Sequence, residues 1–488
     1  MDITPLYFGG SLPTLERSVG GQRVEELSEA SLMRALREGK ALQAEICDVP
    51  LEERLQVIDW LGEWWEMRLK AGELHQAKKA LIESTGYPEK LIDMEFSLVR
   101  KVLSPDEIRD NISTSLMGGL GSLERFCPLR EGEAVRHMPA GPVLIISSGN
   151  SIIPTLIPTT ISLVTGNFTL LKPSLSNYQA ITEIFSSLGE LMSKSPAAHL
   201  MARAMAISYF SHDSPVLEVA LTSAPFGVIN FWGGEPARTA VGQRVARNQH
   251  RPKFFVNGPL TGVAIISEAR ADEQAAHGLA LNMLLYEQQL CSSPTLAVFI
   301  GPYQGAIEFA RSVRAHLQRV GEQYRTSPSD DALFVTNSAR RVMQLRGSTV
   351  FASSDLDNPW TIAVSKEQSN LDKAVISFPS FNVHGRKRFI EVIAVSDVEK
   401  AARIVNSVPQ MQAFQGIDKV QTVGLALPEK LREEVLWELA PSGVFRFVPL
   451  EDMYMRSAVE PYDGVALASL FTYAVHERKH QAHREDKS

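Results

Sequence analysis

Residues 142–174, PVLIISSGNSIIPTLIPTTISLVTGNFTLLKPS, decide the fold class. Two short apolar runs, VLII and FTLL, flank a segment that is long enough for a helix, and Ser, Gly and Asn fill the turn after the first run. A short apolar run bounded by turn residues is typical of a strand that is buried on both faces. The order strand, helix, strand therefore predicts one unit of an open parallel sheet.

The same alternation continues on the C-terminal side of this stretch. Apolar runs that resemble strands recur between helical patterns, as AISYFS (206–211), FGVINFW (226–232) and KFFVN (253–257). The alternation resumes after residue 260 with TGVAIIS, TLAVFIG, TIAVS, FIEVIAV and TVGLAL. Two such series predict two open α/β domains, with ligands at the carboxyl ends of the parallel strands.

The remaining segments complete the predicted organisation. Residues 22–115 carry apolar side chains at helical spacing and predict a helical N-terminal region, and a further helix is predicted over residues 272–290. Residues 320–360 are polar and predict loops and insertions. We expect a cofactor-binding domain with the helical region over 1–256, a second domain over 257–450, and a C-terminal segment over 451–488.

Composition and charge exclude several classes of protein. The formal net charge of −7 gives no basic footprint for nucleic acid. Because no apolar run reaches the roughly 20 residues of a membrane-spanning helix, and the N-terminus has no signal-peptide pattern, we expect a cytoplasmic protein without a membrane span. The cysteines Cys47, Cys127 and Cys291 are widely spaced, which predicts reduced thiols and no zinc site.

The chain also lacks several common catalytic motifs. It contains no GxxxxGK[ST] phosphate loop, no HExxH metal motif and no GxSxG nucleophile turn. The run GGLGSLE (118–124) is the nearest to a dinucleotide GxGxxG, but it does not follow a strand. In the charged C-terminal tail, His476, His480 and His483 have helical spacing, yet we expect a frayed end and no metal there.

Polar residues follow the predicted strands of residues 142–174. Ser147 ends the first strand, and Asn150 lies in the turn before the helix, where an amide either caps the turn or points at a ligand. Lys172 and Ser174 end the second strand, where an ammonium can reach a ribose or phosphate oxygen or simply stay solvated.

Two later segments add candidates. Trp232, Gly233 and Gly234 join a strand to a helix, and glycines at such a junction let backbone N–H groups approach a pyrophosphate or form a simple turn. Cys291, in LLYEQQLCSSP, is either a small buried side chain or a nucleophile. Taken one at a time, these positions leave both interpretations open.

Taken together, the segments resemble the aldehyde dehydrogenase superfamily. The landmarks follow in order as RHMPAGPV (136–143), the Asn150 turn, GNFTLLKPS, FWGG, and a cysteine well beyond FVNG (255–258). A weaker likeness continues to EPYDG (460–464), which resembles the late PFGG signature of that superfamily. The helical N-terminal region makes the chain most similar to the LuxC branch, the acyl-CoA or fatty acid reductases.

The resemblance assigns roles to the candidate residues. It implies Cys291 as the nucleophile and Asn150 as the oxyanion amide, with the nicotinamide cofactor near Ser147, Lys172, Ser174, Trp232, Gly233 and Gly234. The superfamily's water-activating glutamate is replaced by Phe255 or Val256 in FFVNGP, so deacylation by water loses its base. Leu175 stands where a glutamate often binds the adenosine ribose, which makes NADPH the expected cofactor.

The implied reaction is NADPH-dependent reduction of a long-chain fatty acyl thioester to the aldehyde, through an acyl group on Cys291. The acyl donor is either acyl-CoA or an acyl-protein, with an acyl-transferring partner protein, and the resemblance implies a homo-oligomer in which residues 462–475 take part. Two alternatives remain open. One is a hydrolytic NAD(P)-dependent aldehyde dehydrogenase that uses another base, such as Glu287; the other is a cofactor-free acyl-transfer or interaction protein.

Overall fold

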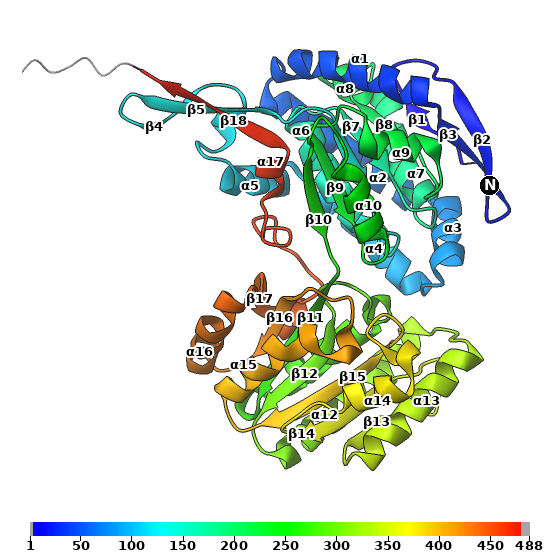
Figure 1. Ribbon diagram of the computed structural model, residues 1–488, viewed down its shortest axis with the longest axis vertical. Helices are drawn as coiled ribbons and strands as arrows, with labels where there is room; N and C mark the ends of the chain where they lie inside the picture. Colours follow the sequence, from blue (N-terminus) through cyan, green and yellow to red (C-terminus); the bar gives the residue numbers. More distant parts are fainter. Residues whose placement is uncertain (1–2, 480–488) are drawn as a thin grey trace, which may run out of the picture. The chain divides into compact units, whose positions relative to one another are not determined.

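The computed structural model describes residues 3–479 and divides into two compact units (Figure 1). Within that range, the first unit comprises residues 3–85, Met94–Asn257 and residues 457–479, and the second comprises Gly86–Asp93 and Gly258–Arg456. The sequence predicts domain limits after residues 256 and 450; the unit changes after Asn257 and again after Arg456. Among the described residues, no helix is long and apolar enough to cross a membrane.

The first unit is built around a six-stranded sheet in the order β1-β8-β7-β6-β9-β10. All neighbours are parallel except β1, which is antiparallel to β8. The apolar runs identified in the sequence form its main strands, as predicted. The strands are β1 (Leu6–Tyr7), β6 (Val143–Ile146), β7 (Thr169–Lys172), β8 (Met205–Ile207), β9 (Val228–Trp232) and β10 (Lys253–Asn257).

Helices surround this sheet. A buried apolar cluster joins β6, β7 and β9 to helices α1, α9 and α10, so these helices cover one face. The helices of the unit are α1 (Glu29–Cys47), α2 (Leu51–Lys70), α3 (His75–Thr85), α4 (Glu89–Val102), α5 (Pro105–Ser115), α6 (Ile153–Val164), α7 (Tyr178–Leu191), α8 (Pro196–Arg203), α9 (Pro215–Thr222), α10 (Ala237–Val245) and α17 (Leu467–Leu470).

The N-terminal region differs from the prediction at its start. Residues 22–27 were predicted to be helical, but β2 (Thr14–Val19) and β3 (Gln22–Leu27) form an antiparallel hairpin. Gly20 and Gly21 have φ values of 60° and 81°, which suit the tight turn between the strands. Helix α1 begins only at Glu29, after the Ser28 side chain caps it by accepting a hydrogen bond from the Ser31 N–H. Local turn geometry thus overrides the apolar spacing of residues 22–27.

A small three-stranded antiparallel sheet completes the first unit. Its order is β18-β5-β4, formed by β4 (Cys127–Arg130), β5 (Glu133–Pro139) and β18 (Thr472–Arg478). β18 pairs with β5 from Thr472 opposite Pro139 to Arg478 opposite Glu133. The segment that the resemblance links to oligomerisation therefore ends in a strand of this sheet. His476 belongs to β18, whereas His480 and His483 lie outside the described residues.

The second unit contains a seven-stranded sheet in the order β13-β14-β15-β12-β11-β16-β17. Only β13 is antiparallel to its neighbour. The strands are β11 (Leu260–Ser267), β12 (Pro294–Ile300), β13 (Thr349–Ala352), β14 (Thr361–Lys366), β15 (Phe389–Val395), β16 (Lys419–Ala426) and β17 (Arg446–Pro449). Side chains on both faces of β11 and β12 are buried, as expected of parallel strands between helices.

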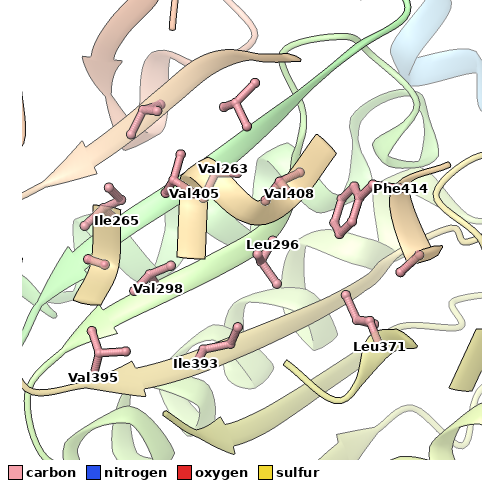
Figure 2. Close-up of a cluster of buried hydrophobic side chains, with 14 of the residues drawn as sticks. Val263, Ile265, Leu296, Val298, Leu371, Ile393, Val395, Val405, Val408 and Phe414 are labelled. Atoms are coloured by element: carbon pink, nitrogen blue, oxygen red, sulfur yellow. The ribbon is translucent and has the colours of Figure 1, made fainter. Parts of the chain in front are cut away.

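Figure 2 shows the core on one face of this sheet. Val263 and Ile265 of β11, Leu296 and Val298 of β12, and Ile393 and Val395 of β15 point at Val405, Val408 and Phe414. The residues alternate along each strand with period two, which places one apolar row of each strand on the same face. The helices of the unit are α11 (Glu273–Leu284), α12 (Tyr303–Val320), α13 (Asp330–Leu345), α14 (Leu371–Ser377), α15 (Val398–Ser407) and α16 (Glu429–Leu439).

The loops predicted for residues 320–360 are only partly present. Helix α13 and strand β13 occupy much of this segment. The Ser329 hydroxyl caps α13 by accepting a hydrogen bond from the Ala332 N–H at 3.3 Å. Only Ala339 and Met343 of α13 are buried, so its polar sequence reflects a solvated helix face.

Candidate active site

The carboxyl edge of the first sheet gathers three predicted residues. Lys172, the last residue of β7, pairs with Ile146 of β6, and Ser147 follows Ile146 directly. On the other side of β6, Ile146 pairs with Phe231 of β9, which precedes Trp232. Ser147, Lys172 and Trp232 therefore end three adjacent strands at one edge, where open α/β sheets bind ligands.

Lys172 lies in a poorly hydrated environment. Burial lowers the pKa of its ammonium to about 8, and the charge of Glu26 opposes that shift. The Lys172 Nζ atom is 5.0 Å from the centre of the Tyr209 ring, at cation–π distance. A lysine ammonium with little water around it gains more than an exposed one from an anionic ligand.

Glu26 is a functional neighbour that the sequence did not reveal. It is fully buried on β3 and accepts hydrogen bonds from the Ser211 N–H at 2.9 Å and the Ser214 hydroxyl at 2.6 Å. Arg17 Nη1 is 3.8 Å from its carboxylate. Because residues 22–27 were predicted as helix, nothing in the sequence placed this carboxylate near Lys172.

Ser147 contributes a hydroxyl that is ready to bind a ligand. Its backbone N–H donates to the Lys172 carbonyl at 3.0 Å, while its buried Oγ atom has no hydrogen-bond partner among the described residues. An unsatisfied buried hydroxyl is costly unless a ligand or water satisfies it. A buried hydroxyl and an ammonium at the ends of adjacent strands fit the ribose and phosphate oxygens of a nucleotide, so these residues fit a nicotinamide cofactor.

Ser174 lies against the turn that follows β6. Its Oγ atom is 3.2 Å from Ser176 Oγ, and the Ser176 hydroxyl donates to the Gly149 carbonyl at 2.9 Å. A Cβ atom at Gly149 would lie 2.6 Å from both hydroxyl oxygens. A side chain at 149 would therefore displace both hydroxyls, and glycine leaves room for them.

Asn150 lies in the turn before α6, as predicted. Its Oδ1 atom accepts a hydrogen bond from the Ser148 hydroxyl at 2.9 Å, which turns the amide N–H₂ group away from Ser148. Asn177 Nδ2 donates to the Ser148 and Ser151 carbonyls at 2.9 and 3.3 Å and so holds the turn. The Ser151 hydroxyl donates to Glu95, a buried carboxylate that sequence reasoning missed. The turn thus orients Asn150 as a hydrogen-bond donor.

The turn after β9 contains Gly233 and Gly234, but the helix that follows already has an anion at its N-terminus. Glu235 accepts hydrogen bonds there from Arg238 Nε at 2.7 Å and from the Thr239 hydroxyl at 2.9 Å. The bonds to Arg238 and Thr239 lower the pKa of Glu235. The predicted approach of a pyrophosphate to this helix end would therefore compete with a carboxylate of the chain itself.

A chain of hydrogen bonds holds Trp232. Its indole N–H donates to Asn230 Oδ1 at 2.6 Å, Asn230 Nδ2 donates to Asn257 Oδ1 at 2.8 Å, and Asn257 Nδ2 donates to Asp463 at 3.0 Å. The Trp232 and Tyr462 rings meet edge to face at 5.3 Å. The EPYDG segment therefore packs at the ends of β9 and β10, and β10 itself contains no carboxylate.

Cys291 belongs to the second unit, in a turn that the sequence predicted as helix. Helix α11 ends at Leu284, and Tyr286, Glu287 and Gln288 adopt positive φ angles of 51°, 52° and 67°. Such angles are unfavourable for residues other than glycine, and they concentrate at functional sites. A three-residue left-handed turn thus separates the helix from the cysteine, which is partly exposed.

The side chain of Gln288 fixes this turn. Its Nε2 atom donates to the Pro294 carbonyl at 2.6 Å, and its Oε1 atom accepts from the Phe389 N–H at 2.8 Å. Both bonds are buried and connect the turn to the first residues of β12 and β15. Cys291 therefore lies at the amino ends of these strands.

Gly262 on β11 allows the cysteine loop to approach the sheet. The Gly262 N–H donates to the Ser293 carbonyl at 3.0 Å. A Cβ atom at 262 would lie 2.3 Å from the Ser292 carbonyl oxygen and 2.7 Å from that of Ser293. Since both atoms belong to the backbone, only glycine permits this contact.

Two further side chains bear on the chemistry of Cys291. The contact of Gln421 with its sulfur was not foreseen from the sequence, whereas Glu287 was considered as a base. Gln421 Nε2 donates to the Cys291 sulfur at 3.2 Å. Glu287, the alternative base for a hydrolytic reaction, accepts a hydrogen bond from Lys387 and lies 3.9 Å from Arg388 Nε. Two cations therefore hold the Glu287 carboxylate. Within the described residues, no group of three or more His, Cys, Asp or Glu side chains could hold a metal ion.

The sequence matches a known family over most of its length. The model of the family described as acyl-CoA reductase (LuxC) matches residues 46–473. A long-chain acyl-protein thioester reductase from Aliivibrio fischeri is 22% identical over 367 residues, which cover 74% of this chain and 69% of that protein. Long-chain acyl-protein thioester reductase 2 from Photobacterium leiognathi is 21% identical over 250 residues, and the match spans half of each protein.

Solved structures show the fold. A salicylaldehyde dehydrogenase from Pseudomonas putida G7 superposes with a TM-score of 0.71 at 15% identity, over 99% of both chains. An NAD-dependent benzaldehyde dehydrogenase from Corynebacterium glutamicum superposes with a TM-score of 0.63 at 16% identity, over 96% of this chain and 95% of that one. The predicted aldehyde dehydrogenase-like α/β fold is therefore confirmed, and the chain belongs to the LuxC acyl-CoA reductase family.

Proposed function

We propose that this protein reduces a long-chain fatty acyl thioester to the fatty aldehyde with NADPH, through an acyl group held on Cys291. The main support is a partly exposed thiol, presented by a strained turn, with an amide donor on its sulfur. The LuxC family and the names of the relatives from A. fischeri and P. leiognathi support the acyl thioester as substrate.

The first step transfers the acyl group to the protein. The Cys291 thiolate attacks the carbonyl carbon of the acyl donor, a new S–C bond forms, and the C–S bond of the donor breaks. The donor leaves as a thiolate, which takes up the proton that Cys291 lost. On the strength of the family resemblance, Asn150 is proposed as the N–H donor for the carbonyl oxygen as negative charge develops on it.

The second step converts the acyl group into aldehyde. When bound, the reduced nicotinamide supplies a hydride for the acyl carbon. Cys291 holds the acyl group, and Asn150 is proposed to stabilise the oxyanion. When the C–S bond breaks, the aldehyde leaves and Cys291 returns to its thiolate form. Because β10 carries no carboxylate, the base that the family resemblance places there to direct water at the thioester is missing from that strand.

Ser147, Lys172, Ser174, Trp232, Gly233 and Gly234 are proposed to bind the cofactor. The Ser147 hydroxyl and the Lys172 ammonium would hold ribose or phosphate oxygens at the carboxyl edge of the first sheet. Leu175 in place of an acidic residue avoids repulsion of a 2′-phosphate, which favours NADPH. The acyl donor is proposed to be an acyl-protein or acyl-CoA, delivered by a transferring partner to a homo-oligomer.

Hydrolysis to the free acid is the less favoured reaction. It would need a general base, and the nearest candidate in sequence, Glu287, is held by Lys387 and Arg388. Lys387 and Arg388 thus engage the carboxylate that would have to orient the attacking water. The products therefore distinguish the two reactions, since reduction gives aldehyde and hydrolysis gives acid.

The test is to incubate the purified protein with acyl-CoA of increasing chain length and NADPH or NADH, following cofactor oxidation and aldehyde release. We expect NADPH oxidation with long acyl chains. Cys291→Ala should lower the rate by at least about 10³-fold, because it removes the proposed acyl acceptor. Radiolabelled acyl-CoA without cofactor should label the wild type and not the variant.

Cys47→Ala is the matched control, because Cys47 is a free cysteine of the first unit. It should keep both the rate and the acyl label. A Cys291→Ala variant that retained the rate would overturn the acyl-enzyme. Release of free acid in place of aldehyde would favour the hydrolytic reaction, and failure of NADPH to bind would favour an acyl-transfer or interaction protein.

A further inference from the structure

Gln421 occupies an irregular position at the start of β16. In the pairing of β11 with β16, Thr261 lies opposite Val420 and Gly262 lies opposite Thr422, so Gln421 is the extra residue of a β-bulge. A bulge interrupts the alternation of side chains and redirects the side chain of the extra residue. Here the redirected side chain is the amide that contacts Cys291.

The neighbouring hydrogen bonds decide which end of this amide faces the sulfur. Arg446 can only donate hydrogen bonds, and its Nη1 atom lies 3.2 Å from the Thr422 hydroxyl oxygen. The Thr422 hydroxyl therefore accepts from Arg446 and gives its own proton to Gln421 Oε1, at 3.1 Å. With the amide oxygen engaged, the N–H₂ group points at Cys291 Sγ, at 3.2 Å.

The network that sets this orientation is buried and firmly held. Gln421, Thr422 and Arg446 are 1%, 0% and 4% exposed. Arg446 also donates to the Met453 carbonyl at 3.3 Å and to the Met455 carbonyl at 2.5 Å. A flipped amide would place its oxygen against the sulfur and leave the Thr422 proton without an acceptor, at the cost of a buried unsatisfied group.

We propose that Gln421 is a positioning residue for the reaction of Cys291, through an N–H bond that favours the thiolate over the thiol. This inference rests on the proposed function, in which Cys291 is the acyl acceptor. The same bond stabilises the sulfur when the thiolate forms in the first step and when it is released at the end of the second. A hydrogen bond donated to the charged form of an acid lowers its pKa.

Several charged groups of the surrounding segments make contacts of their own. Glu287, in the turn before Cys291, is paired with Lys387 and Arg388. The donors of Arg446 reach Thr422 and backbone carbonyls, and Lys419 Nζ lies over the Phe445 ring at 5.4 Å. The amide of Gln421, by contrast, contacts the sulfur directly, at 3.2 Å.

The experiment measures the rate of alkylation of Cys291 by iodoacetamide as a function of pH, by peptide mass spectrometry, without cofactor or substrate. Gln421→Met keeps the length of the side chain but lacks the N–H donor. The pH at which alkylation of Cys291 reaches half its maximal rate should therefore rise by about one unit. Gln421→Glu replaces the donor with a carboxylate and should raise it further. Thr422→Val frees the amide to turn and should give a smaller rise.

Cys47, in the first unit, is the internal control, and its alkylation profile should be unchanged in every variant. An unchanged Cys291 profile in any folded Gln421 variant would overturn the proposal. Loss of folding in all three variants would assign Gln421 to the stability of the sheet and would overturn it too. If the wild type reduces no acyl thioester but the midpoints shift as expected, the proposed function fails while the role of Gln421 toward Cys291 stands.

Discussion

The two sheets place their candidate residues at opposite ends of their strands. In the first unit, Ser147, Lys172 and Trp232 lie at the carboxyl ends of β6, β7 and β9. In the second unit, Cys291 precedes β12, and Gln421 lies near the start of β16, so both lie at the amino ends. The second site therefore departs from the rule that ligands bind at the carboxyl ends of parallel strands.

The difference arises from how each edge is built. At the carboxyl edge of the first sheet, each of these strands runs directly into a turn that carries a polar residue. The local sequence is therefore sufficient to locate the candidate residues there. The amino edge of the second sheet is made by irregularities: a left-handed turn at residues 286–288, a bulge at Gln421, and the missing side chain of Gly262. These irregularities bring Cys291 against strands that are distant in sequence.

After the loss of Cys291 itself, the largest expected effect comes from filling the space at Gly262. In Gly262→Ala, the new Cβ atom meets two backbone carbonyls of the cysteine loop, at 2.3 and 2.7 Å, so the loop must move. We expect at least about a 10²-fold loss of reductase rate, since a displacement of about 1 Å at a reacting group has that cost. The free energy of unfolding should fall by about 2 kcal/mol, measured by denaturant titration.

Gly424→Ala on the neighbouring strand is the matched control. Its Cβ atom would meet the Met453 side chain, with Sδ at 2.3 Å, and a methionine side chain can move aside. We expect a smaller loss of stability and an unchanged alkylation profile of Cys291. Equal rates in the two alanine variants would show that the approach of the loop to Gly262 is not needed for reaction.

The sequence located the candidate residues of the first edge better than those of the second, for the same physical reason. Alternating apolar runs located the strands, and Ser147 and Lys172 then followed from chain order. The position of Cys291 came from family resemblance, because the apolar spacing of LLYEQQL predicts a helix where three positive φ angles occur. Glu26 and Gln421 depend on pairing between distant strands, which periodicity within one segment does not encode.

The charge of Lys172 should make cofactor affinity at the carboxyl edge of the first sheet depend on pH. Because its pKa is lowered to about 8, the ammonium loses its charge as the pH rises through that value. We expect NADPH affinity to fall over this range in the wild type, measured by fluorescence titration. Lys172→Met should weaken binding at neutral pH by about tenfold to a hundredfold, the value of a charged hydrogen bond, and should make affinity independent of pH near 8.

The effect of Lys172 on stability has the opposite sign. A lysine whose folded pKa lies below its usual 10.5 destabilises the fold where it is charged, and this cost is relieved as the pH rises from about 8 to 10.5. Lys172→Met should therefore raise the free energy of unfolding at neutral pH, by on the order of 1 kcal/mol. Loss of stability together with loss of binding would instead mean that Lys172 supports the fold.

The smallest effect concerns the choice between NADPH and NADH at the end of β7. In Leu175→Glu, a carboxylate replaces an uncharged side chain next to Ser174, and it should repel a 2′-phosphate but not a 2′-hydroxyl. We expect the ratio of kcat/KM for NADPH over NADH to fall about tenfold, which corresponds to about 1.4 kcal/mol. Leu175→Gln, of similar size but neutral, should leave the ratio nearly unchanged. Because repulsion between exposed charges is screened, added salt should restore part of the ratio in the Glu variant alone; a ratio insensitive to both substitutions would place the 2′-phosphate away from Leu175.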